Sequence, residues 1–371
     1  MIITMITGSF SAAIAAITFS GDWEKGLTGK GNWKYIQAMD TTSRFTRVTS
    51  PVRQGMYAAR VEVRPGDDPI GSSGNRAEAL VMTDANGIAL NETESSGTQY
   101  FAFSFRLDSS WRPPAADADG AWAIIFQLHG PDNLGASPAV DVSVLNHLSI
   151  GFYSGDLDSA AKSVRYRSYA LSDSSLNIGH WVDLVLKITF VKDFTGSVTA
   201  WRRNEGQTGF VQELQVNNVP TLQYKSSLGG VGAHYWKHGL YCAKQTSITN
   251  VLWIDGMTRG DSYDEVVQAA FRPAAVTMRL PVQRSGGLRV DTDIRSTGEI
   301  RFRVSLPEPD PFSLMIFDAA GRLLWRTFQA PSFACEYPIV WQPKARTPMG
   351  AYFVNVKQND ALAKGTIIIR P

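Results

Sequence analysis

The residues best suited to chemistry form one short run, Tyr235-Trp236-Lys237-His238-Gly239-Leu240-Tyr241. Side chains of a β-strand alternate between its two faces, so a strand here places Tyr235, Lys237 and Tyr241 on one face. Gly239 lies among them and leaves room for a ligand to lie across the strand. Such a face indicates the floor of a binding groove, with a phenol and an ammonium group available for proton transfer or anion binding.

Two further runs place pairs of polar side chains on one strand face. The run 75–79 aligns Arg76 with Glu78, and the run 124–130 aligns Gln127 with His129. Each pair alone also fits a structural role, as an ion pair or a satisfied polar pair, and the lysine and tyrosines also fit a solvated face. Three separate strands that each present a chemically capable face favour a functional site.

The elements that position these residues are short strands. Apolar residues alternate with others in the runs 100–107 and 148–153. Turn clusters at 65–69, 111–114, 172–175 and 228–230 separate such runs, and no long apolar stripe with a helical period occurs. The pattern predicts an all-β fold, an antiparallel sandwich or jelly roll.

Composition limits the partners. The chain has 371 residues, 44% of them hydrophobic, enough to bury a large core in two or three domains. Lys+Arg 36 and Asp+Glu 34 leave a net charge of +2, which is too small to indicate nucleic acid or an anionic membrane surface as a partner, and neither is predicted. No stretch is long enough for a membrane span. An anionic ligand therefore needs locally placed cations.

Changes of pattern divide the chain. Residues 1–16 are apolar and small and predict a secretory signal peptide, with an apolar first strand as the alternative because no Lys or Arg precedes Lys25. We predict one domain over 17–271, a linker over 272–287 and a small β-sandwich over 288–371. From Val276 onward, 13 Lys/Arg and 8 Asp/Glu give a net charge of +5, which leaves −3 for the rest of the chain. That negative charge disfavours the most heavily sulfated polyanions as ligands of the larger domain.

At the three motifs the chain resembles a family. Arg-x-Glu, Gln-x-His and Tyr-x-Lys-x-Gly-x-Tyr, in that order, are similar to motifs of the polysaccharide lyases with a concanavalin-like β-jelly roll. These include the jelly-roll alginate lyases, the glucuronan lyases and the heparin lyase I group; Gln127-Leu128-His129-Gly130 looks closer to the last. The runs 19–26, 179–183 and 253–256 fit the same family. The resemblance spans residues 17–267 and implies an enzyme that cleaves an anionic polysaccharide containing uronic acid.

The resemblance implies β-elimination, whose chemistry explains these residue types. The hydrogen on carbon 5 of a uronate is hardly acidic while the neighbouring carboxylate is ionised, because the carbanion adds a second negative charge. Gln127 and Arg76 are expected to neutralise that carboxylate, with Glu78 orienting the guanidinium. Tyr241 is the expected acid, and also the base where the proton and the leaving oxygen lie on the same side of the sugar. His129 is the base where they lie on opposite faces.

Further residues are assigned to binding. Lys237 is expected to lower the pKa of Tyr241 or to grip a substrate carboxylate, and Tyr235 to line the groove or stack on a sugar. Glu78 is also a candidate substrate-binding residue. Arg165 and Arg167 are expected to share a face and to form either a cationic subsite or a solvated edge.

No cofactor is expected for catalysis. By resemblance to related jelly rolls, Glu24 and Asp255 are candidates to hold a structural calcium ion, which prefers oxygen ligands.

The C-terminal runs 312–322, 350–354 and 364–370 resemble the sorting domain of the bacterial type IX secretion system. That resemblance implies a bacterial protein, secreted or at the cell surface, that contacts the secretion machinery. The alternative is a generic immunoglobulin-like accessory domain.

Other classes of protein use the same fold. A non-catalytic carbohydrate-binding protein has no need of a histidine and a tyrosine aimed at one point. A retaining glycoside hydrolase needs two acidic residues close together, and no Glu-x-Asp-x-x-Glu occurs in the chain. A lyase is therefore the leading hypothesis, and a carbohydrate-binding protein is the alternative.

Overall fold

The computed structural model describes residues 17–71, 73–116, 120–244, 247–271, 275–276, 288–294, 300–308, 310–330, 336–343, 347 and 350–369. The predicted signal peptide and most of the predicted linker lie outside these ranges. Two residues of that linker, Ala275 and Val276, form strand β17. Within the described residues, no helix has the length and apolar character that crossing a membrane requires.

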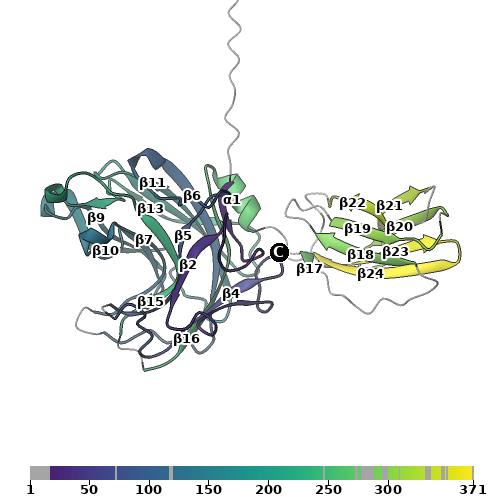
Figure 1. Ribbon diagram of the computed structural model, residues 1–371, viewed down its shortest axis with the longest axis horizontal. Helices are drawn as coiled ribbons and strands as arrows, with labels where there is room; N and C mark the ends of the chain where they lie inside the picture. Colours follow the sequence, from purple (N-terminus) through teal and green to yellow (C-terminus); the bar gives the residue numbers. More distant parts are fainter. Residues whose placement is uncertain are drawn as a thin grey trace, which may run out of the picture.

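Two eight-stranded sheets form the larger body (Figure 1). The front sheet has the order β10-β9-β8-β7-β15-β5-β2, with β14 beside β9. Its neighbouring strands are antiparallel apart from the β14–β9 pair. Its strands are β2 (Trp33–Ala38), β5 (Asn75–Met82), β7 (Ala123–His129), β8 (Val140–Ser143), β9 (Ser149–Asp156), β10 (Ser163–Ala170), β14 (Gln223–Tyr224) and β15 (Tyr235–Cys242).

The back sheet has the order β13-β12-β11-β6-β16-β4-β3, with β1 beside β16. Its strands are β1 (Ile17–Gly21), β3 (Phe45–Val48), β4 (Ala58–Val63), β6 (Thr98–Leu107), β11 (Trp181–Thr189), β12 (Ser197–Asn204), β13 (Val211–Asn217) and β16 (Asn250–Gly260). Short 3-10 turns connect some strands: η1 (Glu94–Ser96), η2 (Asp132–Leu134), η3 (Ala160–Lys162) and η4 (Ser226–Leu228).

The core lies between the two sheets, and the predicted alternation fills it. On β6 of the back sheet, Phe101 and Phe103 are buried and meet aromatic rings of the front sheet. Phe101 lies 4.7 Å from Trp236, ring centre to ring centre, and Trp236 stacks on Phe126 at 4.2 Å. Because alternate residues of a strand face opposite ways, the neighbours of Trp236 and Phe126 along β15 and β7 face away from the core.

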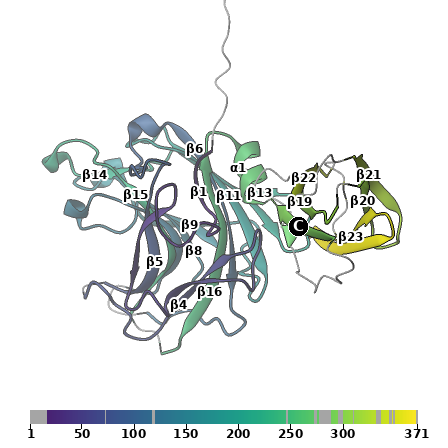
Figure 2. The same cartoon turned by 45° about the vertical axis from the view of Figure 1, so that its right-hand side comes forward.

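One α-helix occurs in the described residues, α1 (Tyr263–Ala270), which the sequence interpretation missed. It begins at Ser262, whose hydroxyl accepts a hydrogen bond from the N–H of Glu265. Its Val266 and Ala270 pack on the face of the back sheet that points away from the main core (Figure 2). The helix therefore covers the sheet opposite to the one that carries the predicted site.

The C-terminal residues form a second, smaller β-sandwich. A five-stranded sheet has the order β17-β24-β23-β20-β21, and a three-stranded sheet has the order β18-β19-β22. Their strands are β17 (Ala275–Val276), β18 (Arg289–Ile294), β19 (Ile300–Ser305), β20 (Phe312–Phe317), β21 (Leu323–Gln329), β22 (Glu336–Trp341), β23 (Gly350–Gln358) and β24 (Ala361–Ile369). Both sheets contribute to one separate core. The predicted fold class, an all-β jelly roll followed by a small immunoglobulin-like sandwich, is confirmed.

Candidate active site

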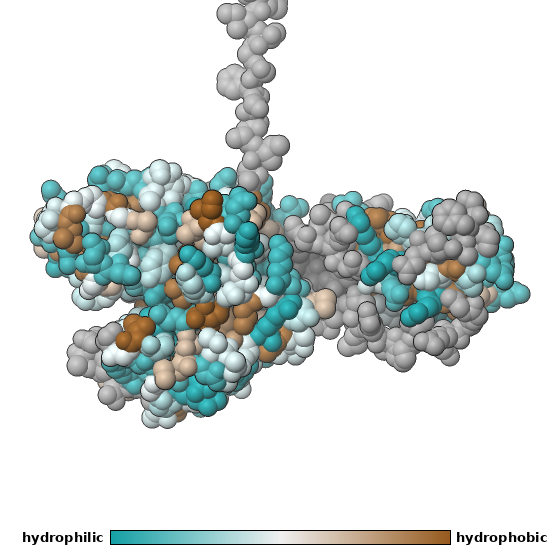
Figure 3. All heavy atoms as spheres, viewed as in Figure 1, coloured by the Kyte–Doolittle hydropathy of each residue, from teal (hydrophilic) through white to brown (hydrophobic). Residues whose placement is uncertain are grey.

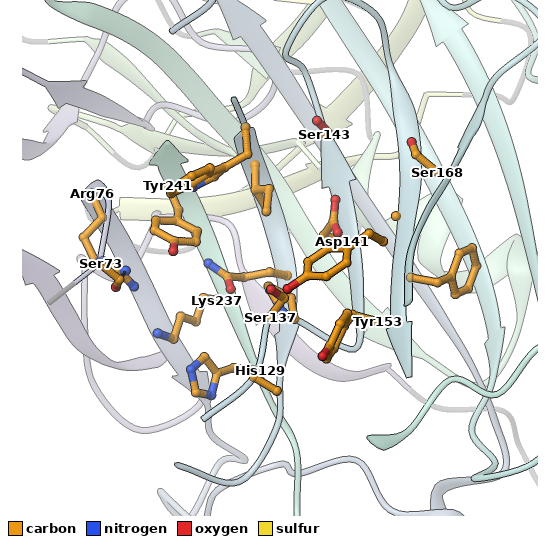
Figure 4. Close-up of a pocket in the computed structure, with 18 of the residues that line it drawn as sticks. Ser73, Arg76, His129, Ser137, Asp141, Ser143, Tyr153, Ser168, Lys237 and Tyr241 are labelled. Carbon is orange, nitrogen blue, oxygen red and sulfur yellow. Dashed lines mark hydrogen bonds between the residues drawn. The ribbon is translucent and has the colours of Figure 1, made fainter. Parts of the chain in front are cut away.

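A pocket with a volume of about 880 Å³ lies on the face of the front sheet that points away from the core. Figure 3 shows the surface hollowed on the left, beside the strands labelled β9 and β10 in Figure 1. Six residues singled out from the sequence line this pocket: Arg76, Gln127, His129, Arg167, Lys237 and Tyr241. Figure 4 shows Arg76, Tyr241, Lys237 and His129 gathered at one end of it. The structure thus brings together residues that are up to 165 positions apart in the sequence.

Strand pairing explains why these side chains meet. β15 lies between β5 and β7, and its residues are paired across both ladders. Tyr241 is opposite Arg76 on β5, and Lys237 is opposite Gln127 on β7. Directly opposed residues on one face of a sheet are close enough for their side chains to interact. The three motifs therefore form one continuous polar floor.

Arg76 lies over the ring of Tyr241, with its guanidinium carbon 4.1 Å from the ring centre. Burial raises the pKa of the Tyr241 phenol, and the charge of Arg76 and hydrogen bonding with Ser73 oppose that rise. Arg76 also donates a 2.6 Å hydrogen bond to the Ser73 hydroxyl. Its Nε is buried and has no hydrogen-bond partner among the described residues.

Glu78 lies beneath the pocket floor. Its side chain is buried and accepts a hydrogen bond from Gln127 through one oxygen, while the other lies 3.4 Å from Arg76. A carboxylate shared by a guanidinium and an amide fixes the orientation of both donors. Glu78 is not among the residues that line the pocket, so its position fits the orienting role predicted for it.

The His129 ring is oriented by the backbone. Its Nδ1 lies 2.6 Å from the carbonyl oxygen of Gly130, which only accepts hydrogen bonds, so Nδ1 carries the proton and Nε2 is the free acceptor. Tyr235 stacks on the ring at 4.9 Å. Burial and the charge of Lys237 lower the pKa of His129, against smaller opposing effects of the Gly130 carbonyl and nearby carboxylates.

Lys237 influences His129, whereas Arg76 is the cation that acts on Tyr241. Burial lowers the pKa of Lys237, with Arg76 acting in the same direction and Glu78 opposing it. Its ammonium group lies 3.5 Å from the side-chain oxygen of Gln37 on β2. Lys237 lines the pocket, whereas Tyr235 does not and serves as a packing partner of His129.

The predicted role of Gly239 is wrong. A side chain there would not point into free space, because an added Cβ would lie 2.2 Å from the carbonyl oxygen of Ala77 and 2.7 Å from the Cα of Glu78. The glycine is needed because the backbone of β5 comes close to β15 at an irregularity of the β15–β7 ladder. The lack of a Cβ at Gly239 therefore allows β5 to pack close to β15, and it does not open space for a ligand.

Arg165 and Arg167 do not share a face. The β10–β9 ladder is irregular between Val164 and Arg167, and Tyr166 has a positive φ of 52°. Such a bulge interrupts the alternation of side chains. Arg167 lines the pocket, whereas Arg165 turns away and donates to the carbonyl of Leu157. The predicted pair is reduced to one cation at the pocket.

Glu24 and Asp255, the predicted calcium ligands, bind backbone amides. Asp255 accepts three N–H hydrogen bonds at 2.7–3.0 Å, from Arg53, Gln54 and Gly256. Glu24 accepts two, from Met56 and Tyr57. Both Glu24 bonds engage the same oxygen, Oε1, and the calcium site stays a prediction. In the described ranges, no three His, Cys, Asp or Glu side chains are grouped to hold a metal.

The pocket residues that the sequence interpretation missed include Asp141 on β8, Tyr153 on β9 and Tyr166 on β10. Burial raises the pKa of the Asp141 carboxyl to about 7. The rings of Tyr153 and Tyr166 are 4.7 Å apart. The alternation of 148–153 predicted a strand that exposes Tyr153, but nothing in the spacing linked these residues to the three motifs.

The fold and the site define a jelly-roll protein with a tyrosine, a histidine and cationic and amide donors in a pocket on its front sheet. The family model for polysaccharide lyases matches residues 25–258. This chain belongs to the polysaccharide lyase family. No curated protein sequence matches it.

Several solved structures are similar to the chain. An endo-β-1,4-glucuronan lyase from the fungus Trichoderma reesei is 17% identical, with a TM-score of 0.49 over 69% of this chain and 98% of that one. An alginate lyase from Pseudomonas aeruginosa is 16% identical, with a TM-score of 0.37 over 60% and 87%. An alginate lyase from Aplysia kurodai is 11% identical, with a TM-score of 0.41 over 66% and 97%.

Proposed function

We propose that this polysaccharide lyase cleaves a polymer containing uronic acid, such as glucuronan, alginate or a glycosaminoglycan, by β-elimination. The reaction leaves an unsaturated uronate at the new end. The observation that carries the proposal is that Arg76, Gln127, His129 and Tyr241 line one pocket. Together they supply the carboxylate neutralisers, the base and the acid that β-elimination needs.

In this proposal, Arg76 and Gln127 neutralise the carboxylate of the sugar that is cut. Arg76 lines the pocket and carries a planar guanidinium group, and the side-chain nitrogen of Gln127 has a second N–H beyond the one that Glu78 holds. Donors fixed in a partly buried site stabilise the extra charge of the carbanion better than water does. Lys237 binds a carboxylate of the substrate beside them.

Proton transfer falls to His129 and Tyr241. The free Nε2 of His129 removes the hydrogen from carbon 5, and the electron pair left behind forms the double bond to carbon 4. The bond from carbon 4 to the glycosidic oxygen breaks, and the phenol of Tyr241 gives its proton to that oxygen. Where both events occur on one side of the sugar, Tyr241 performs both.

The test is ultraviolet absorbance of the protein incubated separately with glucuronan, polymannuronate, polyguluronate, hyaluronan, chondroitin and heparin. Elimination creates a double bond conjugated to the carboxylate, whereas hydrolysis creates none. We expect absorbance to rise with at least one polymer. No rise with any of them, together with measurable binding to one, would replace the lyase by a carbohydrate-binding protein.

The variant Tyr241→Phe tests the acid. We expect turnover to fall at least a hundredfold, within the range that a general acid contributes, while polymer binding is kept. Tyr263→Phe, on helix α1 behind the back sheet, is the matched control and is expected to keep full turnover. Unchanged turnover of Tyr241→Phe would remove Tyr241 from this role.

We also propose that the enzyme acts outside the cell, secreted or at the surface, because a polysaccharide is too large to enter intact. The apolar run 1–16 and the C-terminal sandwich support export, the latter through contact with secretion machinery. Deleting residues 288–371 in the native host is expected to retain the protein inside the cell, as measured by immunoblots of culture medium and cell fractions.

A further inference from the structure

The pocket continues well beyond the proposed catalytic residues. At its other end it is lined from β8, β9 and β10 by Asp141, Tyr153, Tyr166 and Arg167, a group that we call the distal end. Figure 4 shows Asp141 and Tyr153 on the side of the pocket away from Arg76. Three strand spacings separate β15 from β9, which is about 14 Å at roughly 4.8 Å per strand. One sugar ring does not span that distance, so the distal end is within reach only of a longer chain.

Tyr166 presents an aromatic ring at the distal end. Its side chain is 79% exposed, and its backbone has the positive φ of 52° that bulky residues seldom adopt. The irregularity of the β10–β9 ladder holds this conformation, and Tyr153 packs beside the ring at 4.7 Å. Such backbone strain persists only where the surroundings enforce it, and it is frequent at ligand sites. A supported, exposed ring is a surface on which the apolar face of a sugar stacks.

The carboxylate of Asp141 is a hydrogen-bond acceptor that no donor among the described residues engages. Among the described residues, none forms a hydrogen bond or ion pair with its carboxylate, although burial raises its pKa to about 7. It lies against Gly151 of β9, where an added Cβ would be 2.3 Å from a carboxylate oxygen. The Asp141 side chain is half-buried and lines the pocket, so its carboxylate oxygens can accept hydrogen bonds from a ligand there. Sugar hydroxyl groups are such donors, and above about pH 7, where the carboxylate is ionised, a sugar carboxylate or sulfate is repelled.

We infer that the distal end is a sugar subsite, in which Tyr166 stacks on a sugar ring and Asp141 accepts hydrogen bonds from its hydroxyl groups. The inference rests on the proposed function and adds a selection rule. The sugar edge that faces Asp141 bears hydroxyls and no sulfate. Arg167, at the same end, is the cation available to a carboxylate at another edge of that sugar.

The first experiment compares kcat and KM of the full-length wild type, Tyr166→Asn and Tyr166→Phe. Asn tolerates a positive φ, so it removes the ring and keeps the backbone, whereas Phe keeps the ring. The substrates are the polymer that the wild type cleaves and the shortest oligosaccharide of it that is cleaved. We expect Tyr166→Asn to raise KM for the polymer about tenfold with kcat unchanged, and Tyr166→Phe to match the wild type.

Length dependence separates the subsite from a general defect. KM for the shortest oligosaccharide is expected to be the same in all three proteins, because that substrate does not reach the distal end. An unchanged KM for the polymer in Tyr166→Asn would overturn the inference. An equal rise for both substrates would overturn it too, because the ring would then act near the cut.

The second experiment tests Asp141 by binding, in the Tyr241→Phe background where turnover is blocked. The probes are oligosaccharides of glucuronan and the same oligosaccharides after chemical sulfation. The preference is the Kd of the sulfated probe divided by the Kd of the unsulfated one, measured at pH 8. We expect Asp141→Asn to lower this ratio at least fivefold, because the amide keeps an acceptor oxygen and loses the negative charge. An equal ratio of the two Kd values in Tyr241→Phe and in the double variant with Asp141→Asn would overturn the selection rule.

Failure of the proposed function is distinguishable from failure of the subsite. If the wild type turns over none of the six polymers, the proposed function fails, and the Tyr166 variants are compared by affinity for glucuronan and alginate oligosaccharides. Weaker binding by Tyr166→Asn than by Tyr166→Phe would then support the subsite. Equal affinity of the two variants, or no binding at all, would overturn it.

Discussion

The His129 imidazole is oriented to accept a proton. Its Nδ1 donates to the carbonyl of Gly130, so Nε2 carries the lone pair, and the residue lines the pocket. Burial and Lys237 lower the pKa of His129, which keeps the ring neutral at lower pH than usual. Burial raises the pKa of Tyr241, which keeps the phenol protonated at higher pH than usual. The two shifts widen the range in which a neutral base and a protonated acid coexist.

The first prediction concerns the pH profile of kcat/KM, which reports pKa values of the free enzyme. With His129 as base, we expect the acid limb to have its midpoint below about 6.5, the ordinary histidine value. Activity should then stay level and fall on the alkaline side as Lys237 loses its proton, below about 10.4, because burial lowers its pKa. Steady-state rates between pH 4 and pH 11 measure this.

The same profile identifies the base. If Tyr241 were the base, its deprotonated form would be needed, and kcat/KM would continue to rise until the pH passed the raised pKa of the phenol, above about 10. His129→Gln provides the check. If His129 is the base, this variant should lose most turnover and the acid limb of the kcat/KM profile. If His129 is not the base, the variant should have the same pH profile as the wild type.

The second prediction concerns Glu78, a positioning residue beneath the pocket. Its charge raises the pKa values of both His129 and Lys237. Glu78→Gln should therefore move the acid and alkaline limbs of kcat/KM to lower pH. It should also lower kcat roughly tenfold to a hundredfold, less than outright loss of a donor, because Arg76 and Gln127 lose their shared acceptor.

Glu78→Asp is the companion variant. It keeps the charge and shortens the side chain, so we expect both limbs to stay in place while kcat falls. A purely structural role would lower the fraction of folded protein without moving either limb. Limbs that stay in place in Glu78→Gln would contradict the electrostatic part of this prediction.

Residue types and spacing predicted that Arg76, Gln127, His129, Lys237 and Tyr241 share one site, and these residues line the pocket, whereas Tyr235 of the same motif does not. Asp141 and Tyr166 could not be predicted in that way. Their place depends on the order β10-β9-β8-β7 and on a bulge, and neither is written in a local pattern. Glu78 was predicted as a partner of Arg76, but its bond to Gln127 depends on the packing of neighbouring strands.

At the scale of the element, strand β15 depends on close approach to β5. Gly239 has no space for a side chain, because the obstructing atoms belong to the backbone of Ala77 and Glu78. The sequence pointed to this glycine but not to its reason, since the distance between two strands is a tertiary property. Strand β15 also carries Lys237 and Tyr241, so its distance from β5 sets how far these side chains lie from Arg76.

The third prediction is that Gly239→Ala destabilises the jelly roll by roughly 1–3 kcal/mol, the usual cost of overpacking. That corresponds to a fall in Tm of about 2–12 °C for a body of this size. We also expect turnover to fall, because a displaced β15 separates Tyr241 from Arg76. Thermal unfolding followed by circular dichroism and rate measurements check the two parts.

Gly209→Ala is the matched control, because no atom lies within 4 Å of an added Cβ there. It should leave both Tm and turnover unchanged. A normal Tm in Gly239→Ala would show that β5 and β15 separate without cost, against the close contact in the structure.

At the scale of the molecule, the jelly roll was predictable because the whole sequence shows runs that alternate with a period of two, separated by frequent turns. It also lacks long apolar stripes with a helical period. Helix α1 was missed since it has eight residues and only two of them are buried. A signal for it was present, because Ser262 and Glu265 have the spacing of a capping box before an apolar run. The pairing order of the sheets could not be predicted, since it is set by contacts between distant segments.

The last prediction is that the two bodies unfold separately. The large core contains residues between Phe19 and Met257, and the C-terminal core contains residues between Leu288 and Ile367, with none in common. Helix α1 and Phe271 pack on the back sheet, so the larger body continues to Phe271. Calorimetry of the full chain should show two transitions. A small sandwich buries a smaller fraction of its surface, so we expect it to unfold first.

A chain that ends after Phe271 should keep the higher-temperature transition and lose the other. Because every pocket-lining residue precedes it, its kcat on a soluble oligosaccharide should stay within twofold of the full-length value. The C-terminal part carries a net charge of +5 from Val276 onward, so KM for an anionic polymer should rise at low ionic strength when it is removed. A single transition in the full chain, or loss of turnover on the oligosaccharide, would instead mean that the sandwich supports the jelly roll directly.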